Sequence, residues 1–194
     1  MPTPERLNKI NHVVANRQKG IIVLEDIHDP HNAQAVVRSC DSFGFQTIYF
    51  IFENEKQFNP EKVGKLTSSA ANKWVDYKFF ESTEECYAEL KKQGYEIWAT
   101  VLRDDAEDLY QTDITTPNLA LAFGNEHAGL TQYAMDNADR LITIPMHGMT
   151  QSFNLSVTAS IFMFEITRQR KAKGLSYAYD ESYQAGLKET FLSK

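Results

Sequence analysis

Three polar segments of the sequence hold side chains that could bind a substrate or move a proton. They are residues 26–32 (DIHDPHN), 124–129 (GNEHAG) and 145–154 (PMHGMTQSFN). Each follows a short apolar run that is typical of a buried strand. Because the loops after the carboxyl ends of parallel strands usually build the ligand site of an α/β protein, we expect these segments to form one site.

Several common enzyme signatures are missing from the sequence. It has no G-x-G-x-x-G or G-x-x-x-x-G-K-[ST] after a strand, no G-x-S-x-G, and no H-E-x-x-H. The two cysteines, Cys40 and Cys86, belong to no C-x-x-C pair or Cys/His cluster. Dinucleotide-dependent dehydrogenases, P-loop NTPases, serine hydrolases with a nucleophile elbow and zinc enzymes are therefore disfavoured, and no metal is expected.

Apolar runs alternate with stretches of helical periodicity along the chain. Strands are expected at 21–24, 47–52, 95–101, 119–123 and 141–144, and helices at 4–20, 32–43, 83–93 and 153–170, with a final helix or tail at 177–191. The segment 54–69 is open between a long loop and a short helix. This alternation predicts an α/β fold with a mostly parallel sheet and helices on both faces.

Capping residues mark several helix ends. Thr3 suits the start of the first helix, and Asn32 can cap the helix that Gly44 would end. Ser82, with Glu85 three residues later, forms a capping box.

Length and composition point to one globular domain. The chain has 194 residues, of which 42% are hydrophobic and 24% charged, and this length suits a single core. No apolar run approaches the ~18 to 20 residues of a membrane span. The beginning, MPTPERLNKI, lacks the apolar part of a signal peptide. With its two cysteines, the chain is expected to work in the cytoplasm, away from membranes.

The charge is unevenly distributed. With 20 Lys+Arg against 26 Asp+Glu, the net charge of −6 by itself argues against a polyanionic partner. Both ends of the core are nevertheless basic. Residues 1–20 hold Arg6, Lys9, Arg17 and Lys19 against Glu5, and residues 165–173 hold Arg168, Arg170, Lys171 and Lys173 against Glu165. Charge alone does not distinguish a nucleic-acid surface from two solvated helix faces.

Longer stretches around the three polar segments resemble a known family. Residues 24–45 (LEDIHDPHNAQAVVRSCDSFGF), 121–130 (LAFGNEHAGL) and 142–170 (ITIPMHGMTQSFNLSVTASIFMFEITRQR) are similar, in the same order, to the three motifs of the SpoU branch of the SPOUT RNA methyltransferases. Within that branch they lie closest to the tRNA guanosine 2′-O-methyltransferase group, TrmH. Basic helices before and after the core are also typical of that group.

The resemblance implies several properties that composition cannot show. One SPOUT domain would span 1–194, with a basic N-terminal helix at 1–20, a core at 21–170 that ends in a trefoil knot, and a C-terminal extension at 171–194. The family binds S-adenosyl-L-methionine and forms homodimers whose active sites use both subunits. The expected activity is 2′-O-methylation of guanosine 18 of tRNA. The alternatives are another tRNA position, ribosomal RNA, or a non-catalytic RNA-binding member.

The resemblance also assigns catalytic residues. They are Arg38, Asn32, Glu126, Ser152 and Asn154. A protonated 2′-hydroxyl is a poor nucleophile, so the site must remove a proton, stabilise growing negative charge and align the methyl donor. Because a guanidinium with a pKa above ~12 is a reluctant base, Arg38 is expected to contact phosphate and the developing oxyanion, while the proton leaves through phosphate or water.

Each of the other motif residues has an ordinary structural alternative. Asn32 could simply cap its helix, and Ser152 and Asn154 could satisfy loop amides at the start of the last helix. Glu126 could fix its loop instead of orienting an arginine.

Binding residues carry over in the same way. The donor is expected against Thr100, Gly124, Ile144 and Phe153, where Phe153 replaces the leucine typical of the family, and core packing is the alternative for Ile144 and Phe153. RNA is expected to contact His31, Arg6, Arg17, Arg168 and Arg170.

Overall fold

The computed structural model describes residues 2–60 and 71–194. Within these residues seven strands form one sheet, in the order β3-β2-β1-β6-β4-β7-β5. The strands are β1 (Gln18–Glu25), β2 (Phe45–Ile51), β3 (Asp76–Phe80), β4 (Glu96–Thr100), β5 (Glu107–Asp108), β6 (Leu119–Phe123) and β7 (Arg140–Thr143). Every neighbouring pair runs parallel, which confirms the predicted α/β class.

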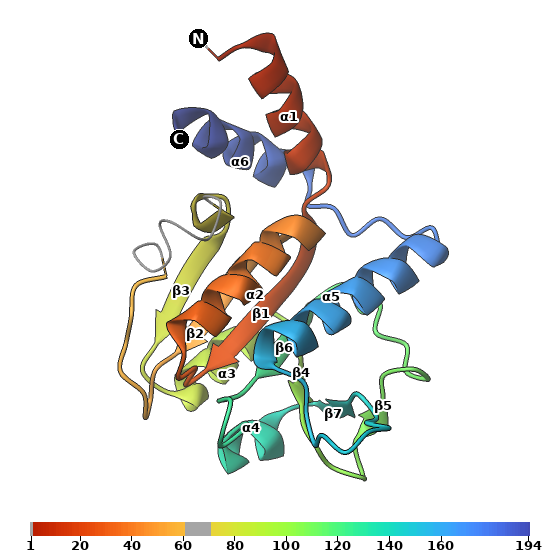
Figure 1. Cartoon of the computed structure of the whole chain (residues 1–194). Coiled ribbons are helices and arrows are strands. Elements are labelled where there is room, and N and C mark those ends of the chain that lie inside the picture. Colours follow the sequence, from red (N-terminus) through yellow and green to blue (C-terminus); the bar gives the residue numbers. More distant parts are fainter. Residues whose placement is uncertain (1, 61–70) are drawn as a thin grey trace.

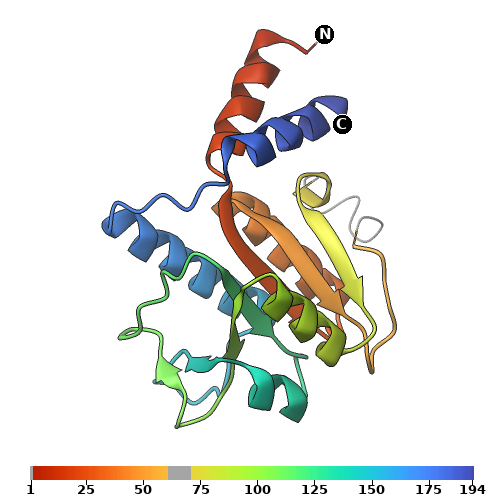
Figure 2. The same ribbon diagram turned by 180° about the vertical axis from the view of Figure 1, so that it is seen from behind.

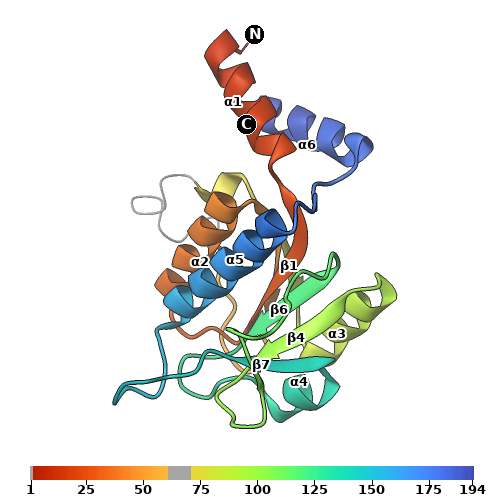
Figure 3. The same cartoon turned by 90° about the vertical axis from the view of Figure 1, so that its right-hand side faces the viewer.

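Helices cover both faces of the sheet (Figure 1). They are α1 (Pro4–Ala15), α2 (Pro30–Phe43), α3 (Thr83–Lys92), α4 (Gln132–Asn137), α5 (Leu155–Ala172) and α6 (Glu181–Ser193), with a short 3₁₀ turn η1 (Ala71–Lys73). Figure 3 shows α2 and α5 side by side on one face, and α3 and α4 on the other. Two apolar cores result, and the central strands β1 and β6 are apolar on both faces because both faces are covered.

The start of α2 differs from the prediction. Asp29, not Asn32, caps this helix, since its Oδ1 accepts the backbone N–H of His31 at 2.8 Å. Pro30 occupies the first helical position, where a missing N–H costs nothing. The helix therefore begins three residues earlier than an Asn32 cap predicts, and the Asn32 side chain is available for other contacts.

The first helix ends at Ala15 instead of residue 20, because residues from Gln18 onward join the sheet as β1. Other boundaries follow the predicted pattern more closely. Thr3 and Ser82 cap α1 and α3 through their hydroxyl oxygens, as predicted. Asn154 caps α5, so this helix starts two residues later than expected. The strand β3 was not predicted because it lies at the sheet edge, where its Asp76 and Lys78 are exposed and no long apolar run is needed. Residues 61–69 of the ambiguous segment lie outside the described residues.

The two terminal helices form a separate lobe. Helices α1 and α6 pack on each other through Ile10, Val14, Leu187 and Phe191. Figures 1 and 2 show this pair standing beyond one end of the sheet, with both chain ends in it. We call residues 4–15 and 181–193 the terminal lobe. None of the helices in the described part of the chain is long and apolar enough to cross a membrane.

Gly44 ends α2 in a conformation that suits glycine alone. Its φ is 84°, and a Cβ at this position would lie 2.6 Å from the carbonyl oxygen of Asn16. We expect Gly44→Ala to lower the free energy of unfolding by about 1 to 3 kcal/mol, measured by urea denaturation. Gly186→Ala is the matched control, since its Cβ would meet nothing within 4 Å in α6. It should be neutral or stabilise by up to ~1 kcal/mol; equal effects at both positions would contradict the argument.

Candidate active site

A cavity of about 840 Å³ opens at the carboxyl ends of β4, β6 and β7. Its walls include parts of all three polar segments. Eight of the predicted catalytic and donor-binding residues line it: Asn32, Thr100, Gly124, Glu126, Ile144, Ser152, Phe153 and Asn154. The chain thus brings together residues that are up to 122 positions apart in sequence.

The predicted donor-binding residues form parts of the cavity wall. A Cβ on Gly124 would lie 2.2 Å from both the Gly129 carbonyl carbon and the Leu130 nitrogen, so no larger residue fits there. Thr100 turns its hydroxyl to the Ala122 carbonyl, at 2.9 Å, and so stays with the sheet. Ile144 is buried and Phe153 is 43% exposed, so the cavity has one packed and one open apolar wall.

Hydrogen bonds between side chains join the three polar segments at the cavity. The Asn154 Nδ2 donates to Asn32 Oδ1 at 3.0 Å, and the Asn32 Nδ2 donates to Glu126 Oε1 at 2.8 Å. At its far end Asn154 is fixed by capping α5, because its Oδ1 accepts the Ser156 N–H at 2.8 Å. We call the chain Asn154–Asn32–Glu126 the amide relay.

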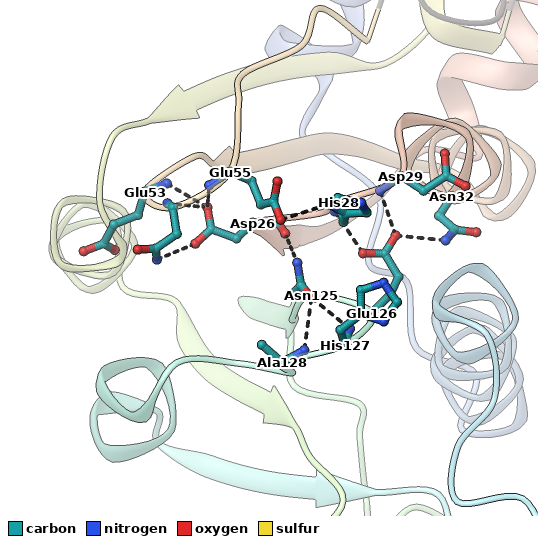
Figure 4. A network of polar contacts seen from close by, with 11 residues as sticks. Asp26, His28, Asp29, Asn32, Glu53, Glu55, Asn125, Glu126, His127 and Ala128 are labelled. Carbon is teal, nitrogen blue, oxygen red and sulfur yellow. Dashed lines mark hydrogen bonds and ion pairs between the residues drawn. The ribbon is translucent and has the colours of Figure 1, made fainter.

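Glu126 also binds the backbone that precedes α2 (Figure 4). Its carboxylate accepts the N–H groups of His28 at 2.9 Å and Asp29 at 3.2 Å. Burial by itself raises the pKa of this carboxyl, but the hydrogen bonds from Asn32, His28 and Asp29 outweigh burial, and the pKa lies below its usual value. Glu126 is therefore ionised at neutral pH and holds the 26–32 segment in place.

A second carboxylate, Asp26, supports the same segment and was missed by the sequence analysis. Its φ is 50°, which is unusual for a residue other than glycine. Its carboxylate accepts the N–H groups of Glu53, Asn54 and Glu55 at 2.8 to 3.1 Å, and its carbonyl accepts Asn125 Nδ2 at 2.7 Å (Figure 4). An acidic residue directly after a buried strand was the only signal in the sequence.

The turn at residues 53–55, whose N–H groups bind Asp26, also contacts the site through Glu55. The Glu55 carboxylate lies 3.0 Å from Nδ1 of His28, whose ring meets that of His127 edge-on, with the ring centres 5.7 Å apart. His127 lines the cavity. Two exposed imidazoles thus stand at the cavity mouth, one of them oriented by a carboxylate.

Arg38 lies away from this cluster. It is exposed on α2, six residues or ~9 Å of helix beyond Asn32. It is not among the described residues that line the cavity, and its guanidinium makes no hydrogen bond with the described part of the chain. Its neighbours on α2, Ala35 and Ser39, line a shallow groove between α2 and α5 of about 360 Å³. The groove is lined by Ala35, Ser39, Ser156, Val157, Ser160, Ile161 and Phe164.

The structure corrects two of the predicted RNA contacts. Arg17 and Arg170 are only 1% and 2% exposed, and both are bonded to carbonyl oxygens inside the protein. The prediction that they contact RNA directly is therefore wrong. Both arginines lie at chain passages between core and terminal lobe, and burial at such a junction cannot be read from local sequence. Arg6, Arg168 and His31 are exposed, and Ser152 is exposed at the cavity rim.

Comparison with known proteins agrees with this geometry. Residues 19–164 match the model of the SpoU rRNA Methylase family. The chain belongs to the SpoU methylase family. Over 177 residues it is 37% identical to the tRNA (guanosine(18)-2′-O)-methyltransferase of Thermus thermophilus, covering 89% of this chain and 87% of that protein. The predicted family membership is thereby confirmed.

Solved structures of SpoU methylases share the fold. The TrmH/SpoU tRNA modifying enzyme of A. aeolicus superimposes with a TM-score of 0.83 at 29% identity, covering 97% of this chain and 96% of that one. The SpoU methyltransferase AviRb from Streptomyces viridochromogenes, solved in complex with the cofactor AdoMet, gives a TM-score of 0.70 at 21% identity, over 89% and 64% of the two chains. This second likeness concerns the fold alone.

The lowered pKa values of Asp26 and Glu126 make a prediction for acid unfolding. In the unfolded chain these carboxyls take up protons near their ordinary values of ~3.9 and ~4.3, and in the folded chain only at lower pH. Their stabilisation is therefore complete above ~pH 5 and is lost as the pH falls through the folded values. The double variant Asp26→Asn, Glu126→Gln should show a flatter fall of unfolding free energy between pH 6 and 3.

Glu84→Gln provides the control for loss of an exposed carboxylate in that measurement. Glu84 is exposed in the first turn of α3, remote from the cavity. The Glu84→Gln variant should keep the wild-type dependence of the unfolding free energy on pH, measured by urea titrations. An Asp26, Glu126 double variant with the slope of the wild type would show that these carboxyls do not couple protonation to folding.

Proposed function

We propose that this SpoU methylase is a tRNA (guanosine(18)-2′-O)-methyltransferase that uses S-adenosyl-L-methionine and acts in the cytoplasm. The amide relay carries the proposal, because it joins the three family motifs at one cavity with their polar side chains paired. The 37% identity to an enzyme of this activity, spread over most of both chains, supports the choice of substrate. Methylation of another RNA position, and RNA binding without catalysis, are the alternatives.

The cavity suits the methyl donor. Its volume of about 840 Å³ lies in the range of small-molecule sites. The close backbone at Gly124 would accept the nucleoside part, and Ile144 and Phe153 would offer it apolar walls. When bound, the donor supplies a methyl group on a positively charged sulfur. Thr100, already bonded to the sheet, would give that part of the wall a fixed shape.

Side chains of the three motifs would bind and orient the ribose. Asn32 of the first motif and Asn154 of the third are hydrogen-bonded to each other, and they would position the sugar beside the donor. Ser152, exposed at the rim, would contact the nucleotide. The ionised Glu126 keeps the 26–32 segment fixed, and His31 at its end would meet a phosphate. Arg38 would stabilise the developing 2′-oxyanion, and the proton would leave through phosphate or water.

This assignment requires two copies of the chain. In one chain Arg38 is not among the residues that line the cavity, and it lies on α2, whose Ala35 and Ser39 line the α2–α5 groove. The large apolar side chains Val157 and Phe164 at this groove are 44% and 56% exposed. Burying such side chains favours self-association. We propose that α2 and α5 of two copies pack together, so that Arg38 of each chain completes the cavity of the other.

The family trefoil knot belongs to the same proposal. The three segments 100–103, 124–130 and 142–155 line one cavity, and β7 lies between β4 and β5. That crowding of loops supports a chain that threads through itself at the donor site. A knot would fix the loops without help from the ligand.

Incubation with labelled donor and unmodified tRNA transcripts tests the activity. We expect one methyl group on the ribose of guanosine 18, located by nuclease mapping. A transcript with a 2′-deoxyguanosine at this position is the control and should remain unlabelled. A methyl group elsewhere would overturn the proposed target, and no transfer to any RNA would leave the non-catalytic alternative.

Replacing Arg38 tests the shared site. Arg38→Ala should reduce transfer about 100-fold or more, with donor binding and thermal stability unchanged, because the side chain is exposed and unbonded. Asn32→Ala should also be inactive. If Arg38 acts across two subunits, mixing and reassociating the two variants restores part of the activity, since one site of each mixed dimer is intact. No recovery in proven mixed dimers would place Arg38 in its own chain's site.

A further inference from the structure

The strand β1 ends at two buried acidic residues, Glu25 and Asp26. Glu25 is the last residue of the strand and is 1% exposed, and Asp26 follows it and is 6% exposed. Neither forms an ion pair with a lysine, arginine or histidine of residues 2–60 and 71–194. Because a buried carboxyl group needs hydrogen-bond donors in place of water, the partners of these two residues show what the end of the strand holds.

Glu25 binds the residue that follows the 124–130 loop. Its Oε2 accepts the backbone N–H of Thr131 at 2.8 Å, and its Oε1 accepts the Thr131 hydroxyl at 2.8 Å. The oxygen of this hydroxyl accepts the N–H of Ala134 at 3.2 Å and so caps α4. Glu25 therefore fixes the point at which the loop ends and α4 begins.

Asp26 binds the beginning of the same loop. Its backbone carbonyl accepts the Asn125 Nδ2 at 2.7 Å, and the Asn125 Oδ1 accepts the N–H groups of His127 at 2.8 Å and Ala128 at 3.0 Å (Figure 4). The carboxylate of Asp26 is held by the N–H groups of residues 53–55, which fixes the direction of its carbonyl. One side chain, Asn125, thus joins the turn inside the loop to the end of β1.

The loop between these two attachment points is a wall of the cavity. All seven residues from 124 to 130 line it. Within the loop, Asn125 and Gly129 exchange backbone hydrogen bonds of 3.0 and 2.9 Å, and the backbone of Gly129 and Leu130 leaves no space for a Cβ on Gly124. The shape of this wall is therefore set by the backbone of the loop, and the loop is attached at both ends to β1.

We propose that Glu25 and Asp26 are positioning residues for the methyl donor, which hold the 124–130 loop at both ends in the conformation that receives it. The inference rests on the proposed function, in which this cavity binds S-adenosyl-L-methionine. Glu25 and Asp26 are not among the described residues that line the cavity, so they act through Thr131 and Asn125. A loop that is fixed before the ligand arrives loses less conformational entropy on binding, and the affinity is higher.

A third hydrogen bond of Glu25 provides the matched control. Its carboxyl group also accepts the hydroxyl of Thr83, the first residue of α3. Thr83 is 1% exposed and is not among the described residues that line the cavity. If Glu25 served stability alone, its bonds to Thr83 and Thr131 would be equivalent. Thr83→Val removes a hydrogen bond from the same buried carboxyl group and leaves both loop contacts in place.

Calorimetric binding of S-adenosyl-L-homocysteine, the demethylated form of the donor with an uncharged sulfur, tests the proposal. Thr131→Val and Asn125→Asp each remove one attachment, and each should raise the Kd about 3- to 10-fold, the factor that one hydrogen bond contributes. Asn125→Asp keeps the oxygen that accepts the His127 and Ala128 N–H groups, so the turn itself is preserved. Thr131→Ser keeps the hydroxyl and should bind as the wild type does. Thr83→Val should lower the Tm but leave the Kd unchanged.

Hydrogen exchange separates positioning of the loop from general stability. In the ligand-free protein, the amides of residues 124–131 should exchange faster in Thr131→Val and Asn125→Asp than in the wild type, and saturation with S-adenosyl-L-homocysteine should restore their protection. Thr83→Val should not change the exchange of these amides. In steady-state assays Thr131→Val should raise the KM for the donor by a larger factor than it lowers kcat.

The outcomes separate this inference from the proposed function. If Thr131→Val and Asn125→Asp bind S-adenosyl-L-homocysteine as tightly as Thr83→Val does, the loop does not need its attachments and the inference is wrong, while the activity stands. Each of the two loop variants is read by itself, so that the failure of one to fold leaves the other to decide. A wild-type chain that does not bind S-adenosyl-L-homocysteine would contradict the proposed function itself.

Discussion

The site depends on the hydrogen bonds that join Asn154, Asn32 and Glu126. These three residues come from different loops, and each loop follows or precedes a different element of the fold. A side-chain amide offers both a donor and an acceptor, so Asn32 can accept from one neighbour and donate to the next. Without this pairing, a carboxylate and two amides would crowd the cavity wall with unmet hydrogen-bonding groups. The polar loops can pack closely because their side chains satisfy one another's hydrogen-bonding groups.

The sequence predicts the parts of this protein that repeat a simple pattern. Parallel strands such as β1 and β6 are apolar on both faces, and helix ends carry Thr3, Ser82 and Gly44, so these elements could be located in advance. The grouping of the polar loops follows from the rule that parallel strands end at one edge. Family resemblance, and not periodicity, pointed to Arg38 and the donor-binding residues.

What could not be predicted depends on distant contacts. Asn32 looks like a helix cap, but Asp29 takes that place and releases the amide for the site. Arg17 and Arg170 look like surface cations in basic helices, but the packing of the lobe buries them. Asp26 acts through three backbone N–H groups that lie 27 to 29 residues further on. In each case the deciding partner is far away in the chain, where local composition carries no information.

Helices α1 and α6 depend on each other for their stability. Each helix hides the apolar stripe of the other, and together they enclose Ile10, Val14, Leu187 and Phe191. Removal of either helix would expose the apolar face of the other to water. An isolated helix of this length is only marginally stable. Helices far apart in the sequence are therefore interdependent, and the lobe can assemble only after α6 has been synthesised.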